Sequence, residues 1–361
     1  MRQLYSKYMF DWETRMTTRD NNRVVRPFEW GLDWTRNWPL AHLHGGSTPP
    51  AADFSSQQRY LSDLNDRILS HSDEFFGYKT PTDFRMTTRI IPGERARSSF
   101  LQFTSPVTTP HPVNNTVSAR WFPAKRHTHK AVVVLPHWNS KPGSYVALCR
   151  ILSKLGIASL RLSLPYHDTR LPADTERSDY AVSANIGRTM DATRQAVIDT
   201  RCCYDWLEQQ GFESFGIVGT SLGSCYAFLA SAHDSRIRVN AFNHASTYFA
   251  DVVWTGQSTR HVKAGIEPVL DRDSLRHAWD AISPMNYFDK FTRQMKKILV
   301  IYATYDLTFL PEFSKQVIEQ FALRNVDHVV KILPCGHYST GETPFKFMDG
   351  WHIGKFLKNS L

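Results

Sequence analysis

The sequence carries a serine in a setting that favours nucleophilic chemistry. The segment GTSLG (219–223) matches G-x-S-x-G, with the apolar run FGIV before it and a helical segment of small residues after it. A sharp strand-to-helix turn crowds the backbone, so small residues are needed two positions to either side of the serine. Such a turn lifts the hydroxyl above the sheet and points the positive end of the next helix toward it. The alternative is a glycine-rich turn in which Ser221 only caps the helix.

A serine hydroxyl is a weak nucleophile unless a base takes its proton and a carboxylate orients that base. Asp306 ends the run ILVIYATYD, and His337 follows the run HVVKILP within PCGHYS. Either residue alone is also typical of a turn or a surface. Their order after Ser221 is the one expected for this kind of turn, so we predict nucleophile Ser221, acid Asp306 and base His337. Three other acids lie at less suitable ends of their elements: Asp251, Asp327 and Asp349.

A nucleophile, an acid and a base that are far apart in the sequence can meet where a sheet brings the ends of their strands together. The chain after about residue 95 has the sequence pattern of such a sheet. Apolar runs typical of buried strands cover about 99–107, 116–122, 131–136, 157–165, 215–221, 239–246, 298–306 and 328–334. Helices are expected between them, at about 144–155, 184–210, 222–233, 312–323 and 344–357. Apolar strands separated by helices indicate a parallel sheet covered on both faces. We therefore predict an α/β fold with a doubly wound, mostly parallel sheet and a site beyond the strands' carboxyl ends.

At these positions the sequence resembles the α/β-hydrolases of the serine esterase type, over about residues 96–361. GTSLG, the YD after the penultimate strand and the GH after the last strand stand where that family places nucleophile, acid and base. The resemblance implies hydrolysis of a small-molecule carboxylic ester through an acyl-enzyme, with no metal and no organic cofactor. Two alternatives remain open, an amidase or oligopeptidase-like hydrolase on the same fold and a non-catalytic binding module on a hydrolase scaffold.

The family resemblance also points to the loop after the third strand, LPHWN (135–139). Relatives commonly carry His-Gly here, and an amide of this loop joins the amide after the nucleophile to form an oxyanion hole. This implies the Leu222 N–H as one donor and the N–H of Asn139 or Trp138 as the other. Trp138 replaces the usual glycine, and its ring fits a pocket wall as well as ordinary core packing. His137 is a candidate for substrate contact.

Two further segments lie near the predicted site. The loop PYHDTRLPADTERSDYAVS (165–183) opens at the same end of the sheet and offers His167 and Arg170 as substrate contacts. Arg170 or Arg177 would meet a carboxylate or another anion, whereas the competing interpretation is a solvated loop held by internal Arg–Asp pairs. Relatives often carry cap elements where this chain has residues 247–291, so we expect a small cap-like insertion there.

Residues 1–95 lack the alternating strand and helix pattern of the predicted catalytic domain, 96–361. Four of the ten tryptophans lie there, namely Trp12, Trp30, Trp34 and Trp38. Leaving so much aromatic surface in water is costly, so this extension is expected to pack on the core, a pocket rim or a second copy in a homo-oligomer. One helix is legible within it, over about 56–76, with Gly77 as its stop.

Composition narrows the function classes. The 361 residues are 42% hydrophobic and carry a net charge of +9 without a basic cluster, which argues against nucleic-acid binding. No apolar run reaches the roughly 20 residues that span a bilayer, and the first thirty residues lack a signal-type apolar core. We expect no stable membrane insertion. The five cysteines form no CxxC pair, and free thiols favour a reducing, cytoplasmic location.

Overall fold

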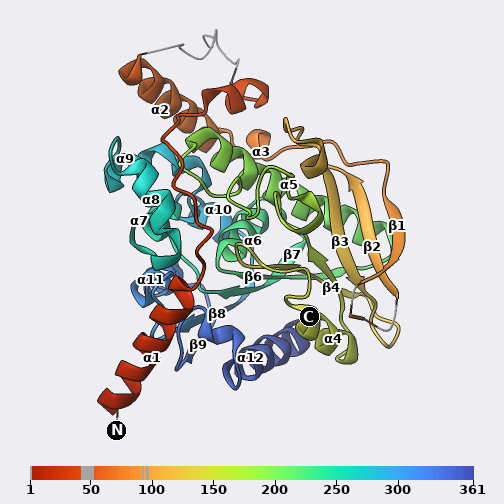
Figure 1. The fold of residues 1–361 in the computed structure, drawn as a ribbon. Coiled ribbons are helices and arrows are strands. Elements are labelled where there is room, and N and C mark those ends of the chain that lie inside the picture. The colour runs from red at the N-terminus through yellow and green to blue at the C-terminus, as the bar shows by residue number, and fades with distance from the viewer. Residues whose placement is uncertain (1, 42–52, 92, 95–96) are drawn as a thin grey trace.

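The computed structural model describes residues 2–41, 53–91, 93–94 and 97–361. At the centre of this part of the chain lies a nine-stranded sheet in the order β1-β2-β3-β5-β4-β6-β7-β8-β9 (Figure 1). Its strands are β1 (Arg85–Ile90), β2 (Arg97–Thr104), β3 (Thr116–Phe122), β4 (Lys130–Leu135), β5 (Ala158–Leu162), β6 (Ser214–Thr220), β7 (Ile237–Asn243), β8 (Lys297–Ala303) and β9 (His328–Leu333). From β5 to β9 the neighbours pair in parallel, whereas β1, β2 and β3 join antiparallel at one edge. The predicted doubly wound, mostly parallel sheet is confirmed.

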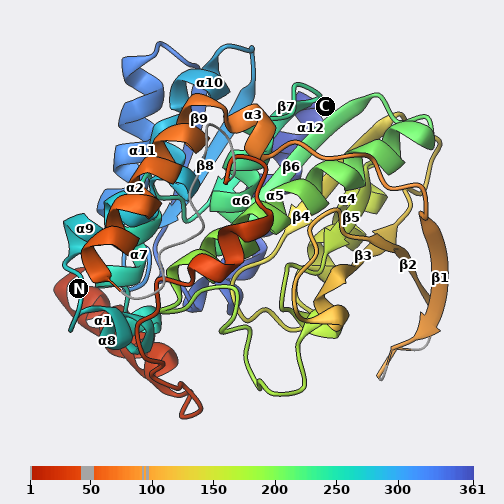
Figure 2. The same cartoon turned by 90° about the horizontal axis from the view of Figure 1, so that it is seen from above.

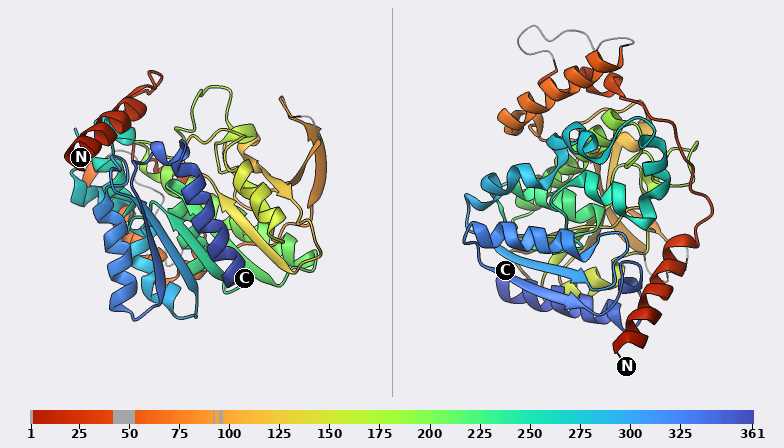
Figure 3. Two further views of the ribbon diagram at one scale, coloured as in Figure 1. Left: turned by 90° about the horizontal axis from the view of Figure 1, so that it is seen from below. Right: turned by 90° about the vertical axis from the view of Figure 1, so that its left-hand side faces the viewer.

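The two faces of the sheet bury separate apolar clusters, because successive side chains of a strand point to opposite faces. On β4, Val133 belongs to the cluster that includes α5 and α6, whereas Val132 and Val134 belong to the cluster of α4 and α12. Figure 3 shows α12 and α4 on their shared face. The helices that flank the sheet are α4 (Val146–Lys154), α5 (Ile186–Gln209), α6 (Leu222–Ala232), α11 (Pro311–Leu323) and α12 (Phe345–Ser360). Burial on both faces explains why β4 reads as a continuous apolar run.

Several strands end earlier than the sequence predicted, and at β7 and β8 this places chemistry in loops. β7 ends at Asn243 rather than near residue 246, because His244 takes a left-handed conformation with φ of 55°. β8 ends at Ala303, so Asp306 lies three residues beyond the sheet in a turn. The loop after β9 carries His337. Three polar side chains therefore emerge from neighbouring strands at the same edge of the sheet.

The segment predicted as a cap-like insertion, 247–291, is helical. It contains α7 (Phe249–Thr255), α8 (Arg260–Ile266), α9 (Arg272–Ala278) and α10 (Phe288–Thr292), with short 3₁₀ turns between them. Trp279 is fully buried here and packs edge-on against Phe249 at 5.3 Å between ring centres. Among the helices of the described residues, none combines the length and the apolar character needed to cross a membrane.

The N-terminal segment packs on the rest of the chain in two places. The expected helix at 56–76 is two helices, α2 (Phe54–Ser70) and α3 (Ser72–Phe75), because His71 leaves the helical conformation. Helix α2 lies beside α9 (Figure 2), and Trp38 is buried with its indole N–H donated to Asp191 at 2.8 Å. The boundary predicted between residues 95 and 96 lies outside the described residues.

Helix α1 (Arg2–Thr18) was not predicted, and it lies far from α2 on the side of β8, β9 and α12 (Figures 1 and 3). It contacts η4 (Gln257–Thr259) and η7 (Ser339–Gly341), two short 3₁₀ turns that follow α7 and β9 in the chain. Its apolar residues show little helical periodicity because some face solvent, such as Leu4 and Tyr8. This weak pattern explains why the sequence did not reveal the helix.

Candidate active site

Ser221 occupies the sharp turn between β6 and α6. Its backbone has φ of 58° and ψ of −122°, a strained conformation for a residue with a side chain. Both glycines of the motif are required by packing. A Cβ on Gly219 would lie 2.2 Å from the Gly223 carbonyl oxygen, and one on Gly223 would lie 2.3 Å from the Leu135 carbonyl oxygen. The G-x-S-x-G spacing therefore follows from the crowding of this turn.

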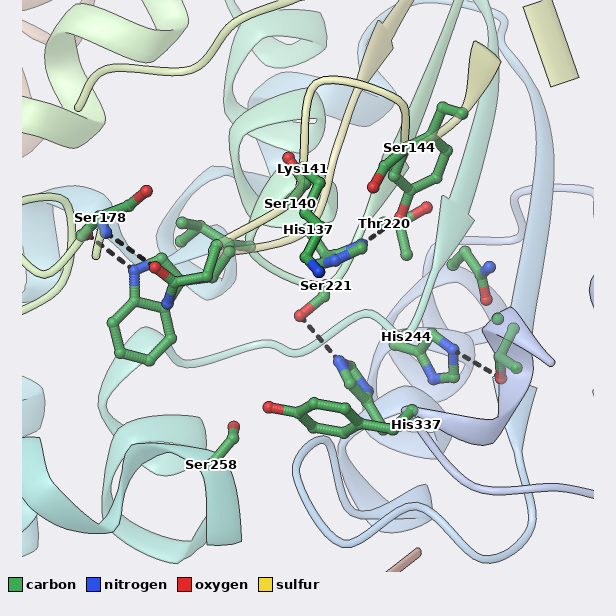
Figure 4. Close-up of a pocket in the computed structure, with 18 of the residues that line it drawn as sticks. His137, Ser140, Lys141, Ser144, Ser178, Thr220, Ser221, His244, Ser258 and His337 are labelled. Carbon is green, nitrogen blue, oxygen red and sulfur yellow. Dashed lines mark hydrogen bonds between the residues drawn. The ribbon is translucent and has the colours of Figure 1, made fainter. Parts of the chain in front are cut away.

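The structure brings the three predicted residues together. Ser221 Oγ lies 3.0 Å from His337 Nε2 (Figure 4), and His337 Nδ1 lies 2.8 Å from Asp306 Oδ2. The other carboxylate oxygen of Asp306 accepts hydrogen bonds from the amides of Thr308 and Phe309, both at 2.7 Å. The carboxylate is thus fixed by its own loop and faces the imidazole in one orientation.

The electrostatics of this group suit a base next to a permanent anion. Burial opposes ionisation of Asp306, but the charge of His337 and the hydrogen bonds from His244 and His337 hold the Asp306 pKa well below its usual range. Burial would lower the pKa of His337, but the charge and the hydrogen bond of Asp306, with a contribution from Glu13, raise that pKa above its ordinary value. His337 is therefore a stronger base than a free imidazole.

His244 is a further member of this group that the sequence analysis missed. Its Nδ1 lies 2.7 Å from Asp306 Oδ2, and its Nε2 lies 3.3 Å from Thr340 Oγ1. Burial and the charge of His337 lower its pKa, so His244 serves as a neutral donor to Asp306. Its place at the carboxyl end of β7 was the available signal, the same one that identified Asp306 and His337.

These same side chains are the one group of potential metal ligands close enough to share an ion within the described residues, namely His244, Asp306 and His337. Both histidine Nδ1 atoms already lie at hydrogen-bond distance from one oxygen of Asp306. Two N–H donors on one carboxylate oxygen account for this geometry. The arrangement is that of an acid–base pair with a supporting histidine.

On the opposite side of Ser221 lies the loop after β4. The Asn139 amide donates to His167 Nε2 at 3.0 Å, and Asn139 Oδ1 accepts from the Ser178 amide at 2.7 Å. The Asn139 N–H is thus committed within the protein, which leaves Trp138 as the other candidate named for the second oxyanion donor. Leu222 begins α6, where the first amides have no partner inside the helix.

His167 does not contact the cavity, which corrects its prediction as a substrate contact. Its ring is fully buried, its Nδ1 donates to the Pro165 carbonyl at 2.8 Å, and its Nε2 accepts from Asn139. Burial lowers the pKa of His167 to about 4, so the ring stays neutral. His167 therefore supports the loop of Trp138 and Asn139 from behind.

Arg170 is also withdrawn from the site, contrary to the prediction. Its guanidinium lies 2.8 Å from Asp199 Oδ2, with neither side chain exposed, and it donates to the carbonyls of Asn114 and Ser163. The ion pair with Asp199 holds the Arg170 guanidinium in the core. Arg177 lines the cavity and pairs with Asp179 at 3.3 Å. Both arginines thus have acidic partners within the protein, but the loop is largely buried rather than solvated, and Asp199 lies outside it.

A cavity of about 1530 Å³ opens at Ser221 and His337. Its wall includes His137 and Trp138, whose indole N–H donates to the Ser178 carbonyl at 2.9 Å (Figure 4). Hydroxyl groups and apolar groups share the lining near Ser221, among them Ser140, Ser258, Thr308, Phe249, Val252 and Phe309. Such a mixed, concave surface is typical of a small-molecule site.

His137 faces this cavity as a neutral ring. Its Nδ1 lies 2.8 Å from the Tyr145 hydroxyl, and burial lowers its pKa to about 3. Asp349 lines the same cavity and accepts a hydrogen bond from Asn243 at 3.0 Å, and burial raises the pKa of Asp349 to about 7. Neither His137 nor Asp349 contacts Asp306. His337, which does contact Asp306, is therefore the histidine that can act as the base, rather than His137.

No protein-family model matches this chain, and no curated protein matches it. Solved structures do: acetyl xylan esterase 1 from Thermoanaerobacterium sp. JW/SL YS485 superposes with a TM-score of 0.57 at 14% identity, over 92% of this chain and 99% of that one. The acetyl xylan esterase from Paenibacillus sp. R4 gives 0.58 at 12%, over 87% and 97%. The Pyrococcus horikoshii acylaminoacyl peptidase gives 0.54 at 11%, over 77% of this chain and only 42% of that longer one. These likenesses establish the α/β-hydrolase fold.

Proposed function

We propose that this chain is a serine hydrolase that cleaves small-molecule carboxylic esters through an acyl-enzyme. One observation carries the proposal, the continuous line from Ser221 Oγ to His337 Nε2 at 3.0 Å and from His337 Nδ1 to Asp306 Oδ2 at 2.8 Å. This is the arrangement in which a base and an orienting carboxylate activate a serine hydroxyl. The strained backbone at Ser221 and the raised pKa of His337 support it.

In the first half of the reaction, Ser221 Oγ attacks the ester carbonyl while His337 Nε2 accepts its proton. Asp306 stabilises the imidazolium that forms. The negative oxygen of the tetrahedral intermediate is held by the amide of Leu222 and, in this proposal, by that of Trp138. Each such donor contributes about 3 kcal/mol to the transition state. The C–O bond then breaks, His337 gives its proton to the leaving alcohol, and the acyl group stays on Ser221.

In the second half, water replaces the alcohol. His337 accepts a proton from the water as it attacks the acyl carbonyl, and returns that proton to Ser221 Oγ when the acid leaves. One ester and one water thus give one acid and one alcohol. Every proton moves through His337, so the scheme needs no metal and no organic cofactor.

Other structural features support proposals about the protein's location, its self-association and its contact with substrate. All five cysteines are buried and free, which supports the proposal of a reducing, cytoplasmic location. Exposed apolar side chains on α1, such as Leu4 and Tyr8, support the proposal that copies of the chain associate through the N-terminal extension. His137, at the cavity wall, is proposed to contact the substrate.

The proposal is tested with a fluorophosphonate probe followed by peptide mass analysis, with Ser221→Ala as the matched control. We expect one adduct, on Ser221, in the wild-type protein and none in the variant. A graded series of esters from acetyl upward, run beside aminoacyl amides, then separates ester from amide cleavage. Folded wild-type protein that forms no adduct and matches the variant's background rate would instead favour a non-catalytic binding module.

A further inference from the structure

The side chain of Glu13 is fully buried, although it belongs to a helix near the start of the chain. Helix α1 carries it to the loop that follows β9, the loop of His337 (Figure 3). A buried carboxylate is costly unless several donors satisfy it. The burial of Glu13 is explained by the hydrogen bonds that its carboxylate accepts.

The carboxylate of Glu13 binds the two residues that follow His337. The Tyr338 amide donates to Glu13 Oε1 at 2.7 Å, and the Ser339 amide and hydroxyl donate to Oε2 at 3.1 and 3.0 Å. On the other side of His337, a Cβ on Gly336 would lie 2.3 Å from Glu13 Oε2. The loop is thus shaped around this carboxylate, with a glycine where the carboxylate needs room.

Helix α1 also reaches the loop of Asp306. The Tyr5 hydroxyl donates to the Pro334 carbonyl at 2.5 Å, in the chain just before the His337 loop. The rings of Tyr5 and Phe10 pack edge-on against Tyr305, the residue before Asp306, at 5.8 and 5.2 Å between ring centres. One helix therefore contacts both loops that supply the acid and the base, and it restrains their separation.

We propose that Glu13 is a positioning residue of this reaction centre: its carboxylate holds the loop that carries His337, and its charge favours the imidazolium formed during the reaction. This inference rests on the proposed function for its catalytic meaning. The structural part, that Glu13 sets the position of His337, stands on the contacts of the loop alone.

The charge effect can be read from the groups that face His337 on all sides. Asp306 and Glu13 are the acids, and each raises the pKa of His337, with Asp306 the stronger. His244 and His137 face it as rings whose pKa values are lowered, chiefly by burial. Removing the charge of Glu13 leaves Asp306 as the remaining acid, so the pKa of His337 must fall.

The test compares Glu13→Gln with Asp11→Asn, which removes the same charge from an exposed position on the same helix. The glutamine NH₂ group of the first variant faces either the Tyr338 or the Ser339 amide, neither of which can accept, so a hydrogen bond is lost as well as the charge. We expect kcat to fall about tenfold with KM nearly unchanged, because a misplaced base costs rate rather than binding. The acid limb of the kcat/KM profile should move to lower pH. Asp11→Asn should behave as the wild type.

A milder variant, Ser339→Ala, removes one donor to Glu13, together with the oxygen that accepts from the Gly336 amide, and guards against loss of folding in Glu13→Gln. It should change kcat in the same direction by a smaller factor. Glu13→Gln or Ser339→Ala that is folded, with the rate and pH profile of the wild type, would overturn the proposal.

Nuclear magnetic resonance titration of the His337 ring separates this proposal from the proposed function. Glu13→Gln should lower the His337 pKa and weaken the low-field Nδ1–H signal, whether or not any ester is cleaved. An unchanged titration would reject the role of Glu13 even if Ser221 proves to be the nucleophile. Wild-type protein without activity above Ser221→Ala, but with the expected change in titration, would reject the esterase and retain Glu13 as the residue that positions His337.

Discussion

The two sides of Ser221 each carry two histidines, but they differ in whether a carboxylate lies within hydrogen-bond distance of the rings. On the side of β7, β8 and β9, His337 and His244 both face Asp306 at 2.8 and 2.7 Å. On the side of β4 and β5, His137 and His167 meet a hydroxyl and backbone groups instead. Burial lowers the pKa of these two rings to about 3 and 4, whereas the pKa of His337 is raised.

The difference shows that burial and partner, rather than residue type, decide what a histidine does in this site. Asp306 offers one oxygen to two rings, and only one of them can become the proton carrier without placing two cations side by side. His337 is the ring that carries the proton, and His244 remains a neutral donor. Across the cavity, neutral rings hold a loop in place.

The largest effect should come from Asp306→Asn, which gives His337 the kind of neutral partner that His137 already has. We expect kcat to drop about 10⁴-fold at neutral pH, because the ring loses its orientation and its counter-charge. Steady-state ester hydrolysis measures this drop. Asp327→Asn, an exposed acid before β9, should leave kcat as it is. A drop of less than tenfold in Asp306→Asn would show that the carboxylate does not drive the difference between the two sides.

On the other side, His167→Gln should lower kcat about 10²-fold, because it removes the rigid ring that bridges the Pro165 carbonyl and the Asn139 amide and so loosens the neighbouring Trp138 amide. The acid limb of the pH profile should keep its wild-type position, because His167 does not carry the proton. Kinetics over a pH series check both points, with His127→Gln in an exposed loop as the control. A shift of the acid limb would contradict the assignment of His167 as a support.

His244→Gln should affect stability more than chemistry. Loss of a hydrogen bond to the buried Asp306 carboxylate costs about 2 kcal/mol in the free energy of unfolding. Urea unfolding of the wild type and the variant measures this difference at pH 7. If His244→Gln instead abolished activity while the free energy of unfolding stayed constant, His244 would be part of the proton path.

The smallest expected effect concerns the pH dependence of the wild-type protein. It is the pH at which the acid limb of the activity profile lies. His337 must be neutral to accept a proton, and its pKa is raised in the folded protein. Activity should therefore be complete well above the ordinary imidazole range and be lost as the pH falls through a value above that range. The pH dependence of kcat/KM for a neutral ester reports this pKa. A limb below the ordinary imidazole range would mean that burial outweighs Asp306.

Much of this site was predictable because its signals are local. Ser221 sits in a motif whose glycines are required by the same turn, and Asp306 and His337 lie three and four residues after the ends of apolar strands. The same reasoning failed for His167 and Arg170. A position after a strand places a residue at the right end of the sheet but does not say where its side chain points, and here Asn139 and Asp199 draw these side chains inward.

Other parts had no local signal. His244 lay inside what read as a continuing strand, and only its left-handed backbone separates it from β7. Glu13 meets its partners 325 and 326 residues further along the chain, and the helix that carries it lacks an apolar stripe. Long-range pairing of a single polar residue leaves no periodicity in the sequence.

That separation along the chain has a consequence for biosynthesis. The segment with Glu13 is synthesised 325 residues before the loop that it binds. Parts of the sheet can form while translation continues, but a chain released early, before residue 339, has no site of this kind.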